Sequence, residues 1–201
     1  WDLRSNNVIT RLETSSSLVS QMKFSPDGQT LATFQRPASS KNPGTSKLQL
    51  FDVATGRGQV SVDPGAEWLH DLCFSHEGSR LFTLDDKGLQ EWSLPSLIPA
   101  RRTLIAESDF DLFDRPRPST GLAASQGSTL CVRTDGGTIV FDTRENQILK
   151  EVRDTYQSSV SASGTTLWIL DSKIRQRNIP LTKDSAEPAP VEFSRPVVGP
   201  G

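Results

Sequence analysis

The chain has 201 residues, enough for one or two ordinary domains with a sizeable core. Its net charge of −2 and its scattered basic residues exclude a strong field of one sign, so nucleic acid is not indicated as a partner. No run of roughly 20 apolar residues is present, so the sequence predicts no membrane span. Two cysteines do not make a disulfide framework, and we expect Cys73 and Cys131 to be buried and reduced.

A sequence pattern, which we call the phrase, recurs along the chain at intervals close to the roughly 40–45 residues of a four-stranded propeller blade. Each copy has an apolar strand, a Phe-Ser-x-x-Gly turn and further short strands, the third of which ends in an aromatic residue and often Asp. The phrase is clearest at 22–28 with 48–52, and it returns at 72–78 with 89–93. A unit that recurs at this length predicts an array of small sheets.

Four full repeats are predicted from the alternation of apolar and polar residues and from the turn signals between them. The first repeat, 19–63, has predicted strands at 19–24, 30–34, 47–52 and 58–62, with a long exposed loop at 36–46. The second, 69–106, has them at 69–74, 80–84, 89–93 and 102–106. The third, 119–153, has them at 121–125, 129–132, 138–142 and 147–152. The fourth, 157–181, has them at 159–162, 166–170 and 174–179.

Three segments lie outside these four repeats. Residues 1–13 match the last two strands of a preceding, partial repeat, so that 1–183 would form one repeat domain. Residues 108–114 alternate acidic and apolar side chains, and we interpret them as an extended connector, with a partner-docking motif as the alternative. The Pro-rich tail 184–201 is predicted to be linker-like, with an outer strand at 191–193.

The repeats resemble WD40 repeats, most clearly at 24–28, at 50–56 and at Asp135-Gly136-Gly137 with Phe141-Asp142. This resemblance covers about residues 1–180 and implies an all-β fold, a β-propeller of four-stranded antiparallel blades. Its style is similar to arrays in large bacterial multidomain proteins, some of which follow a Ser/Thr kinase domain. The family's Gly-His pair ahead of the first strand has no counterpart here, so we expect the blades to rest on apolar packing.

Four full repeats and part of a fifth predict an incomplete ring. Each sheet of such an array buries its two faces against its neighbours, so an open array exposes apolar faces at both ends. The chain also begins with Trp1 in the middle of a repeat, so we expect it to be a piece of a larger propeller. Self-association through the open faces is one way in which they could be covered.

A search for catalytic residues finds no candidate. Neither His70 nor His76, the only imidazoles, stands in a nucleophile motif, and we interpret His76 as a solvated turn residue. Cys73 lies three residues before His76 but has no second pair of ligands, so no metal site is predicted. Asp85 and Asp86 are expected to cap a turn through backbone amides, and no phosphate-binding loop or cofactor site is predicted.

The tryptophans lie in different settings. Trp92 and Trp168 belong to predicted strands, and we expect both to pack between sheets. Trp68 lies in the connection that precedes a first strand, where an exposed Trp would anchor an interface. Partial burial under a neighbouring loop is the favoured interpretation for Trp68, and an interface anchor is the alternative.

The sequence therefore favours a non-catalytic scaffold or recognition module that binds a protein or peptide through its loops. The predicted contact residues are Arg36, Trp68, His70, Asp85 and Asp86. One alternative is a regulatory or sensor region of a larger enzyme such as a bacterial kinase, and another is part of a propeller hydrolase or lyase. The sequence does not define the compartment, and the cytoplasm is the favoured interpretation.

Overall fold

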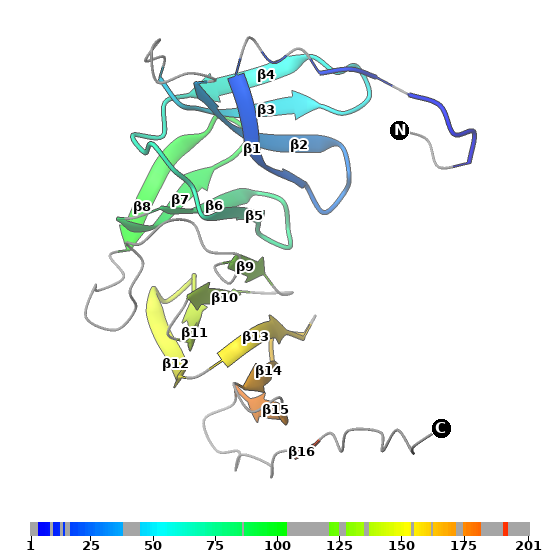
Figure 1. Ribbon diagram of the computed structural model, residues 1–201. Coiled ribbons are helices and arrows are strands. Elements are labelled where there is room, and N and C mark those ends of the chain that lie inside the picture. Colours follow the sequence, from blue (N-terminus) through cyan, green and yellow to red (C-terminus); the bar gives the residue numbers. More distant parts are fainter. Residues whose placement is uncertain are drawn as a thin grey trace.

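The computed structural model is all-β, and its described residues contain strands and no helix (Figure 1). The structure describes residues 4–8, 10–12, 14, 17–37, 45–85, 87–103, 121–124, 128–134, 137–153, 155–161, 163–171, 175–181 and 191–192. Among them there is accordingly no long apolar helix of the kind that spans a bilayer.

The strands form four antiparallel sheets of four strands each, and within every sheet the strands follow chain order. Sheet 1 contains β1 (Ser17–Phe24), β2 (Thr30–Pro37), β3 (Lys47–Asp52) and β4 (Gly58–Val62). Sheet 2 contains β5 (Asp71–Phe74), β6 (Arg80–Asp85), β7 (Gly88–Ser93) and β8 (Ile98–Thr103). Sheet 3 contains β9 (Gly121–Ala124), β10 (Thr129–Thr134), β11 (Gly137–Asp142) and β12 (Gln147–Arg153). Sheet 4 contains β13 (Thr155–Val160), β14 (Thr166–Asp171), β15 (Arg175–Pro180) and β16 (Val191–Glu192).

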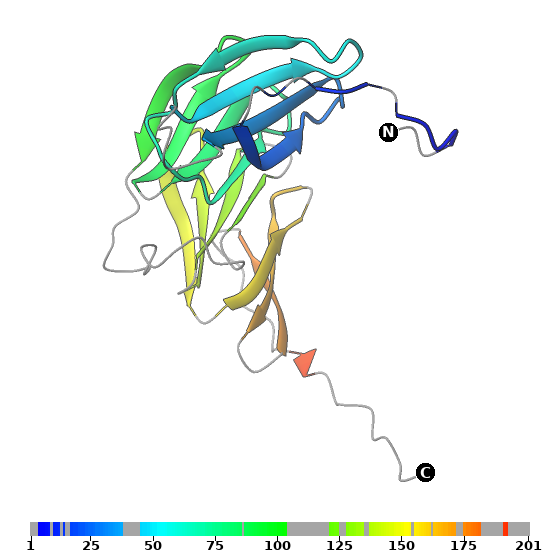
Figure 2. The same cartoon turned by 45° about the horizontal axis from the view of Figure 1, so that its top comes forward.

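The sheets follow one another in chain order as an open array (Figures 1 and 2). Their first strands are neighbours, because β1 contacts β5, β5 contacts β9 and β9 contacts β13. The strands β4, β8 and β12 lie on the opposite side of the array (Figure 1). The arrangement is consistent with a propeller-like fold, and the described sheets do not close a ring.

Apolar cores fill the three junctions between successive sheets. We call the face of a sheet on the side of the preceding sheet its leading face, and the opposite face its trailing face. The first core joins Ala32, Phe34, Leu48 and Leu50 of sheet 1 to Leu72, Phe74, Leu81 and Trp92 of sheet 2. The second joins Cys73, Phe82, Leu84 and Leu89 to Leu122, Leu130, Val132, Ile139 and Phe141. The third joins Cys131, Val140 and Val152 to Val160, Leu167, Ile169 and Ile179.

The Phe-Ser-x-x-Gly phrase has a clear structural role at the turn between the first two strands of a sheet. In sheet 1 the Ser25 hydroxyl accepts a hydrogen bond from the Thr30 N–H at 2.9 Å. The same contact joins Ser75 to Arg80 at 3.1 Å. The glycine of each turn has a positive φ, 71° at Gly28 and 73° at Gly78, a conformation that costs a residue with a Cβ more than glycine. The phrase is therefore a turn signature.

Most predicted strands agree with the structure, and two differ. The first strand of sheet 4 was expected at 159–162, but β13 covers Thr155–Val160. The last strand of sheet 2 differs as well. It was expected at 102–106, but β8 covers Ile98–Thr103 and pairs with β7 from Ser93↔Ile98 onward. Pro99 is tolerated because β8 is an edge strand, where a missing N–H breaks no ladder bond. The connector at 108–114 lies outside the described residues.

At the two ends of the chain the structure describes less. The described residues of the predicted partial repeat, 1–13, form a turn at 4–6 and an isolated bridge at 7, and Trp1 lies outside the description. The predicted outer strand at 191–193 is present as β16, which pairs with β15 at Gln176↔Val191.

Two predicted burials had different outcomes. Trp92 is buried at the first junction, as expected, and its indole Nε1–H donates to the Thr83 hydroxyl at 2.9 Å. The burial predicted for Trp168 is wrong, because its side chain is 47% exposed. Trp168 lies on the trailing face of sheet 4, and no described sheet follows that face.

Candidate functional site

The connection between β4 and β5 crosses from sheet 1 to sheet 2 and carries the exposed Trp68. Leu69 belongs to the apolar core at that junction, and Ala66 packs against it. The Asp63 carboxylate accepts a hydrogen bond from the Gly65 N–H at 2.8 Å, and the Lys87 ammonium donates to the Gly65 carbonyl at 3.4 Å. The connection is thus anchored on both sides of Trp68.

Trp68 and Arg36 form a stacked pair at this end of the junction. The Arg36 guanidinium carbon lies 3.5 Å from the centroid of the Trp68 ring. Arg36 pairs with Leu18 in the β1–β2 ladder and is half-buried, whereas Trp68 is 41% exposed. A guanidinium over an indole face is attracted by the ring quadrupole, which contributes on the order of 0.5–2 kcal/mol. The pair therefore presents an aromatic surface held in one orientation, and we call it the Arg36–Trp68 corner.

Two of the other predicted contact residues are not at the surface. His70 is buried directly before β5, where its N–H donates to the Leu84 carbonyl at 2.8 Å and its carbonyl accepts from the Gln21 side chain at 3.0 Å. The expectation that His70 lies on a binding surface is wrong, because the residue is buried and its backbone is bonded to both sheets of the junction.

The prediction for Asp85 is also wrong as regards exposure. Its carboxylate is buried and accepts hydrogen bonds from the Arg102 guanidinium at 2.8 and 2.9 Å. The predicted turn cap is confirmed, since Asp85 also accepts from the Lys87 N–H at 2.8 Å. A buried carboxylate needs such partners, and because these contacts occupy it, the role of the Asp85 side chain is structural. Asp86 lies outside the described residues.

Asp71 was missed by the sequence reasoning and connects three sheets. One carboxylate oxygen accepts from the N–H of Leu72 at 2.8 Å and lies 4.0 Å from the Lys23 ammonium of sheet 1. The other oxygen accepts from the Leu122 N–H of sheet 3 at 2.9 Å. A lone Asp in a strand gives no sequence signal, because its partners are distant in the chain.

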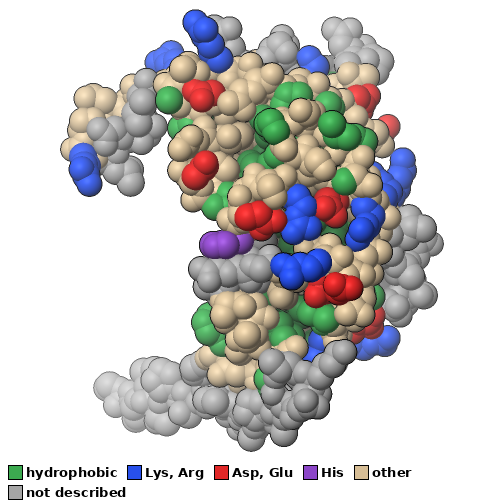
Figure 3. Space-filling model, turned by 180° about the vertical axis from the view of Figure 1, so that it is seen from behind, with side chains coloured by type: hydrophobic (Ala, Val, Ile, Leu, Met, Phe, Trp, Pro, Cys, Tyr) green, Lys and Arg blue, Asp and Glu red, His purple; other side chains and the backbone are tan. Residues whose placement is uncertain are grey.

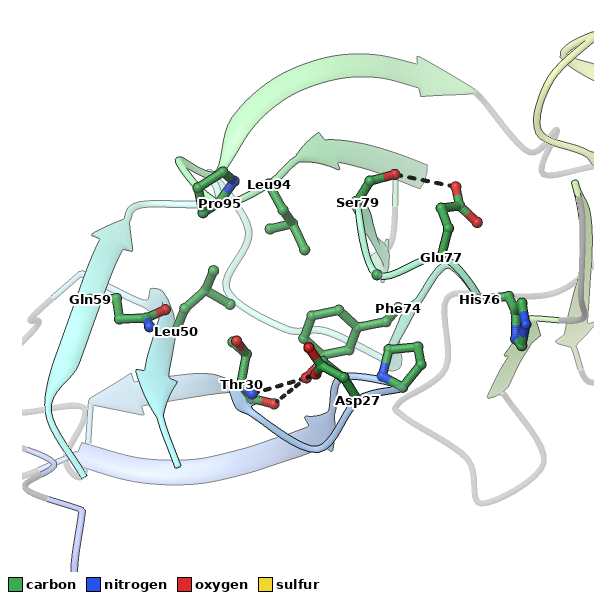
Figure 4. A pocket seen from close by; sticks show the side chains of 13 residues that line it. Asp27, Thr30, Leu50, Gln59, Phe74, His76, Glu77, Ser79, Leu94 and Pro95 are labelled. Atoms are coloured by element: carbon green, nitrogen blue, oxygen red, sulfur yellow. Dashed lines mark hydrogen bonds between the residues drawn. The ribbon is translucent and has the colours of Figure 1, made fainter. Parts of the chain in front are cut away.

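A groove of about 410 Å³ lies at the opposite end of the first junction (Figure 4). Its apolar lining comes from Leu50, Phe74 and Leu94, which belong to or pack against the core between the two sheets. Carboxylates from the two serine turns, Asp27 and Glu77, lie at its edge (Figure 4). The size falls within the roughly 300–1,000 Å³ range of ligand pockets.

Both carboxylates of the groove are already bonded within their own turns. The Ser25 hydroxyl, at 2.5 Å, and the Gln29 N–H, at 3.0 Å, hold the pKa of Asp27 below its ordinary value. Glu77 is paired with Arg80 at 3.0 Å. The groove could accept an apolar side chain with a cationic end. Because its acidic groups serve the turns, we regard it as secondary to the Arg36–Trp68 corner.

Charged side chains elsewhere are balanced locally. Figure 3 shows acidic and basic side chains interspersed across the middle of one face. Arg80 illustrates the pattern, because its guanidinium contacts both Glu77, at 3.0 Å, and Glu91, at 3.4 Å. Such pairing gives no extended field of one sign on that face.

The cysteines are buried and do not form a disulfide, as expected. Burial raises the pKa of the Cys131 thiol to about 11, and burial also raises the pKa of Cys73 far above its usual range. Within the described parts of the chain, no group of three or more His, Cys, Asp or Glu side chains is placed to hold a metal ion.

No protein-family model matches this sequence, and a comparison with curated proteins likewise finds no match.

Proposed function

We propose that the chain is a non-catalytic recognition module, a WD40-like propeller segment that binds a protein or peptide at the Arg36–Trp68 corner. The observation that carries the proposal is the exposed Trp68 ring fixed under the Arg36 guanidinium at 3.5 Å. Trp and Arg are enriched among the residues that dominate interface energies. The repeated turns, the sheet order and the apolar junctions support the propeller part of the proposal.

The corner also limits the entropy that binding would cost. An exposed Trp on a free loop would lose rotamer and backbone freedom when a partner orders it. Here Leu69 lies in the core directly after Trp68, and the stacked guanidinium restricts the indole ring. A partner could therefore cover the ring with little further ordering of the module. The neighbouring guanidinium would favour a carboxylate or a backbone carbonyl beside the residue that contacts the ring.

The proposal is tested by crosslinking in the source cells. A photoreactive phenylalanine analogue replaces Trp68 in one variant and the exposed Ile98 in a matched control, and adducts are identified by mass spectrometry. We expect a discrete protein adduct from position 68 that is absent from position 98. Trp68→Ala should then weaken binding of that partner at least about 30-fold, the loss typical of an interface hot spot.

The outcomes separate binding at the corner from general stickiness. Arg36→Lys keeps the charge but loses the planar stack, so we expect it to weaken binding less than Trp68→Ala does. Adducts that are identical from positions 68 and 98, or a partner whose affinity is unchanged in Trp68→Ala, would show that the corner is not the binding site.

A further inference from the structure

The groove at the first junction is bounded by two turns of the same kind, one from each sheet. Residues 25–28 and 75–78 both place an acidic residue two positions after the serine of the turn. Between these turns, Leu50, Phe74 and Leu94 point into the groove (Figure 4). The residues that line it, all in the described part of the chain, include no Lys or Arg. The groove thus combines an apolar floor with carboxylates at its edge.

The Asp27 carboxylate uses only one of its two oxygens for its own turn. The Ser25 hydroxyl and the Gln29 N–H both donate to Oδ1, at 2.5 and 3.0 Å, and the lowered pKa that results keeps the group ionised at neutral pH. Among the described residues, no hydrogen bond uses Oδ2, and no Lys or Arg pairs with this carboxylate. A carboxylate has about four acceptor sites, so Oδ2 is available to a ligand.

Glu77, the corresponding residue of sheet 2, differs because it has a cationic partner. Its Oε1 accepts hydrogen bonds from the Arg80 guanidinium at 3.0 and 3.2 Å, and Arg80 also contacts Glu91 at 3.4 Å. Two carboxylates therefore share one guanidinium, which leaves a net negative charge on this side of the groove as well. Together with the unmatched charge of Asp27, this makes the groove complementary to a cation.

We infer that the groove is a second binding site, which takes a long basic side chain, lysine or arginine, of a peptide partner. Such side chains bury their methylene stems against apolar surface and carry their charge at the tip. The stem would lie on Leu50, Phe74 and Leu94, and the cationic end would donate to Oδ2 of Asp27. A hydrogen bond between two charged groups is stronger than one between neutral groups, and the turn already fixes the acceptor. This inference goes beyond the proposed function, because the groove lies at the opposite end of the junction from the Arg36–Trp68 corner.

The experiment titrates the 201-residue chain with the tripeptide acetyl-Ala-Lys-Ala-amide and follows the backbone amide signals by NMR. We expect saturable shifts, in the millimolar range, that centre on residues 25–30 and 74–79. Norleucine in place of the peptide's lysine keeps most of the stem and removes the ammonium, so it should weaken binding at least about tenfold. Diaminopropionic acid keeps the ammonium and removes most of the stem, and it should weaken binding by a similar factor or more. The arginine peptide should bind at the same residues.

Two matched variants of the protein test the role of the carboxylate. Asp27→Asn removes the charge, but its amide oxygen can still accept the two bonds of the turn, so the variant should fold and bind the lysine peptide at least about tenfold more weakly. Asp142→Asn is the control, because Asp142 caps a turn of sheet 3 through the Arg144 N–H at 2.8 Å and does not line the groove. It should bind the peptide like the native chain.

The outcomes keep this site separate from the Arg36–Trp68 corner. Trp68→Ala should leave binding of the lysine peptide unchanged, whether or not the corner binds a partner of its own. The inference would be overturned by the absence of saturable shifts below about 10 mM peptide. Equal affinity for the norleucine peptide, native affinity in Asp27→Asn, or an equal loss in Asp142→Asn would each overturn it as well.

Discussion

The strongest test of the junction architecture compares one substitution at two equivalent positions, Phe24→Ala and Phe74→Ala. Burial of a Phe side chain removes on the order of 150–250 Å² from water, and Phe→Ala in a core costs about 3–5 kcal/mol once the cavity is included. Phe74 is almost fully buried against sheet 1, so we expect the full loss there. Phe24 keeps about two-fifths of its surface covered, and its loss should be about 1 kcal/mol.

The assay is urea unfolding at a protein concentration low enough to keep the chain monomeric, with the midpoint and slope fitted for each variant. The two variants share residue type, strand position and turn, so the difference between them isolates the effect of the neighbouring sheet. Equal losses at low concentration would refute the junction model, because they would mean that Phe24 is buried within a single chain.

Three further predictions concern buried and bonded groups. Arg102→Met should lower the free energy of unfolding in urea by about 3 kcal/mol, because it leaves the buried carboxylate of Asp85 without its partner, and Asp85→Asn in the same chain should restore part of that loss. The Thr55 hydroxyl and N–H lower the pKa of Asp52, so the contribution of this carboxylate to stability is present above the unfolded pKa of about 3.9 and is lost as the pH falls through the lower folded pKa. Asp52→Asn should therefore flatten the decline of the urea midpoint between about pH 5 and pH 2. An unchanged decline would contradict this role of Asp52. Burial of the Cys73 and Cys131 thiols predicts that a thiol reagent at pH 8 modifies neither until urea unfolds the chain, and fast labelling of the native protein would show that the junctions open.

The sequence predicts the local elements well because they depend on local signals. The Phe-Ser-x-x-Gly turns combine a serine that accepts a backbone N–H with a glycine that adopts positive φ, and both requirements are legible in the residues. Strand alternation likewise identifies which side chains share a face. Strand bounds are less predictable. The sequence placed the last strand of sheet 2 at 102–106, whereas β8 already begins at Ile98 and includes Pro99, which an edge strand tolerates.

The candidate site was only partly predictable, for a physical reason. The sequence identifies Trp68 as an unusual residue in a connection, but its fixed orientation depends on Arg36, which reaches it from another strand. Asp85 looks like a surface residue because turns are usually exposed, and His70 looks like one because its side chain is polar. Their burial follows from contacts with Leu84 and Arg102, at distances in sequence that no local pattern encodes.

Burial in an array is a property of the neighbouring sheet as much as of the residue, and the tryptophans of β7 and β14 make this explicit. Trp92 and Trp168 both lie in well-formed strands of the same kind of sheet, and nothing in their local sequence separates them. One is covered because a sheet faces it, and the other is half-exposed because none does. In a nearest-neighbour array each sheet gains stability from the sheets on both of its sides, and no described sheet follows sheet 4. A partner that covers the trailing face of sheet 4 would therefore stabilise that sheet selectively, whereas binding at the Arg36–Trp68 corner would act on the first junction alone. Hydrogen exchange measured sheet by sheet can thus distinguish the two kinds of partner before either has been identified.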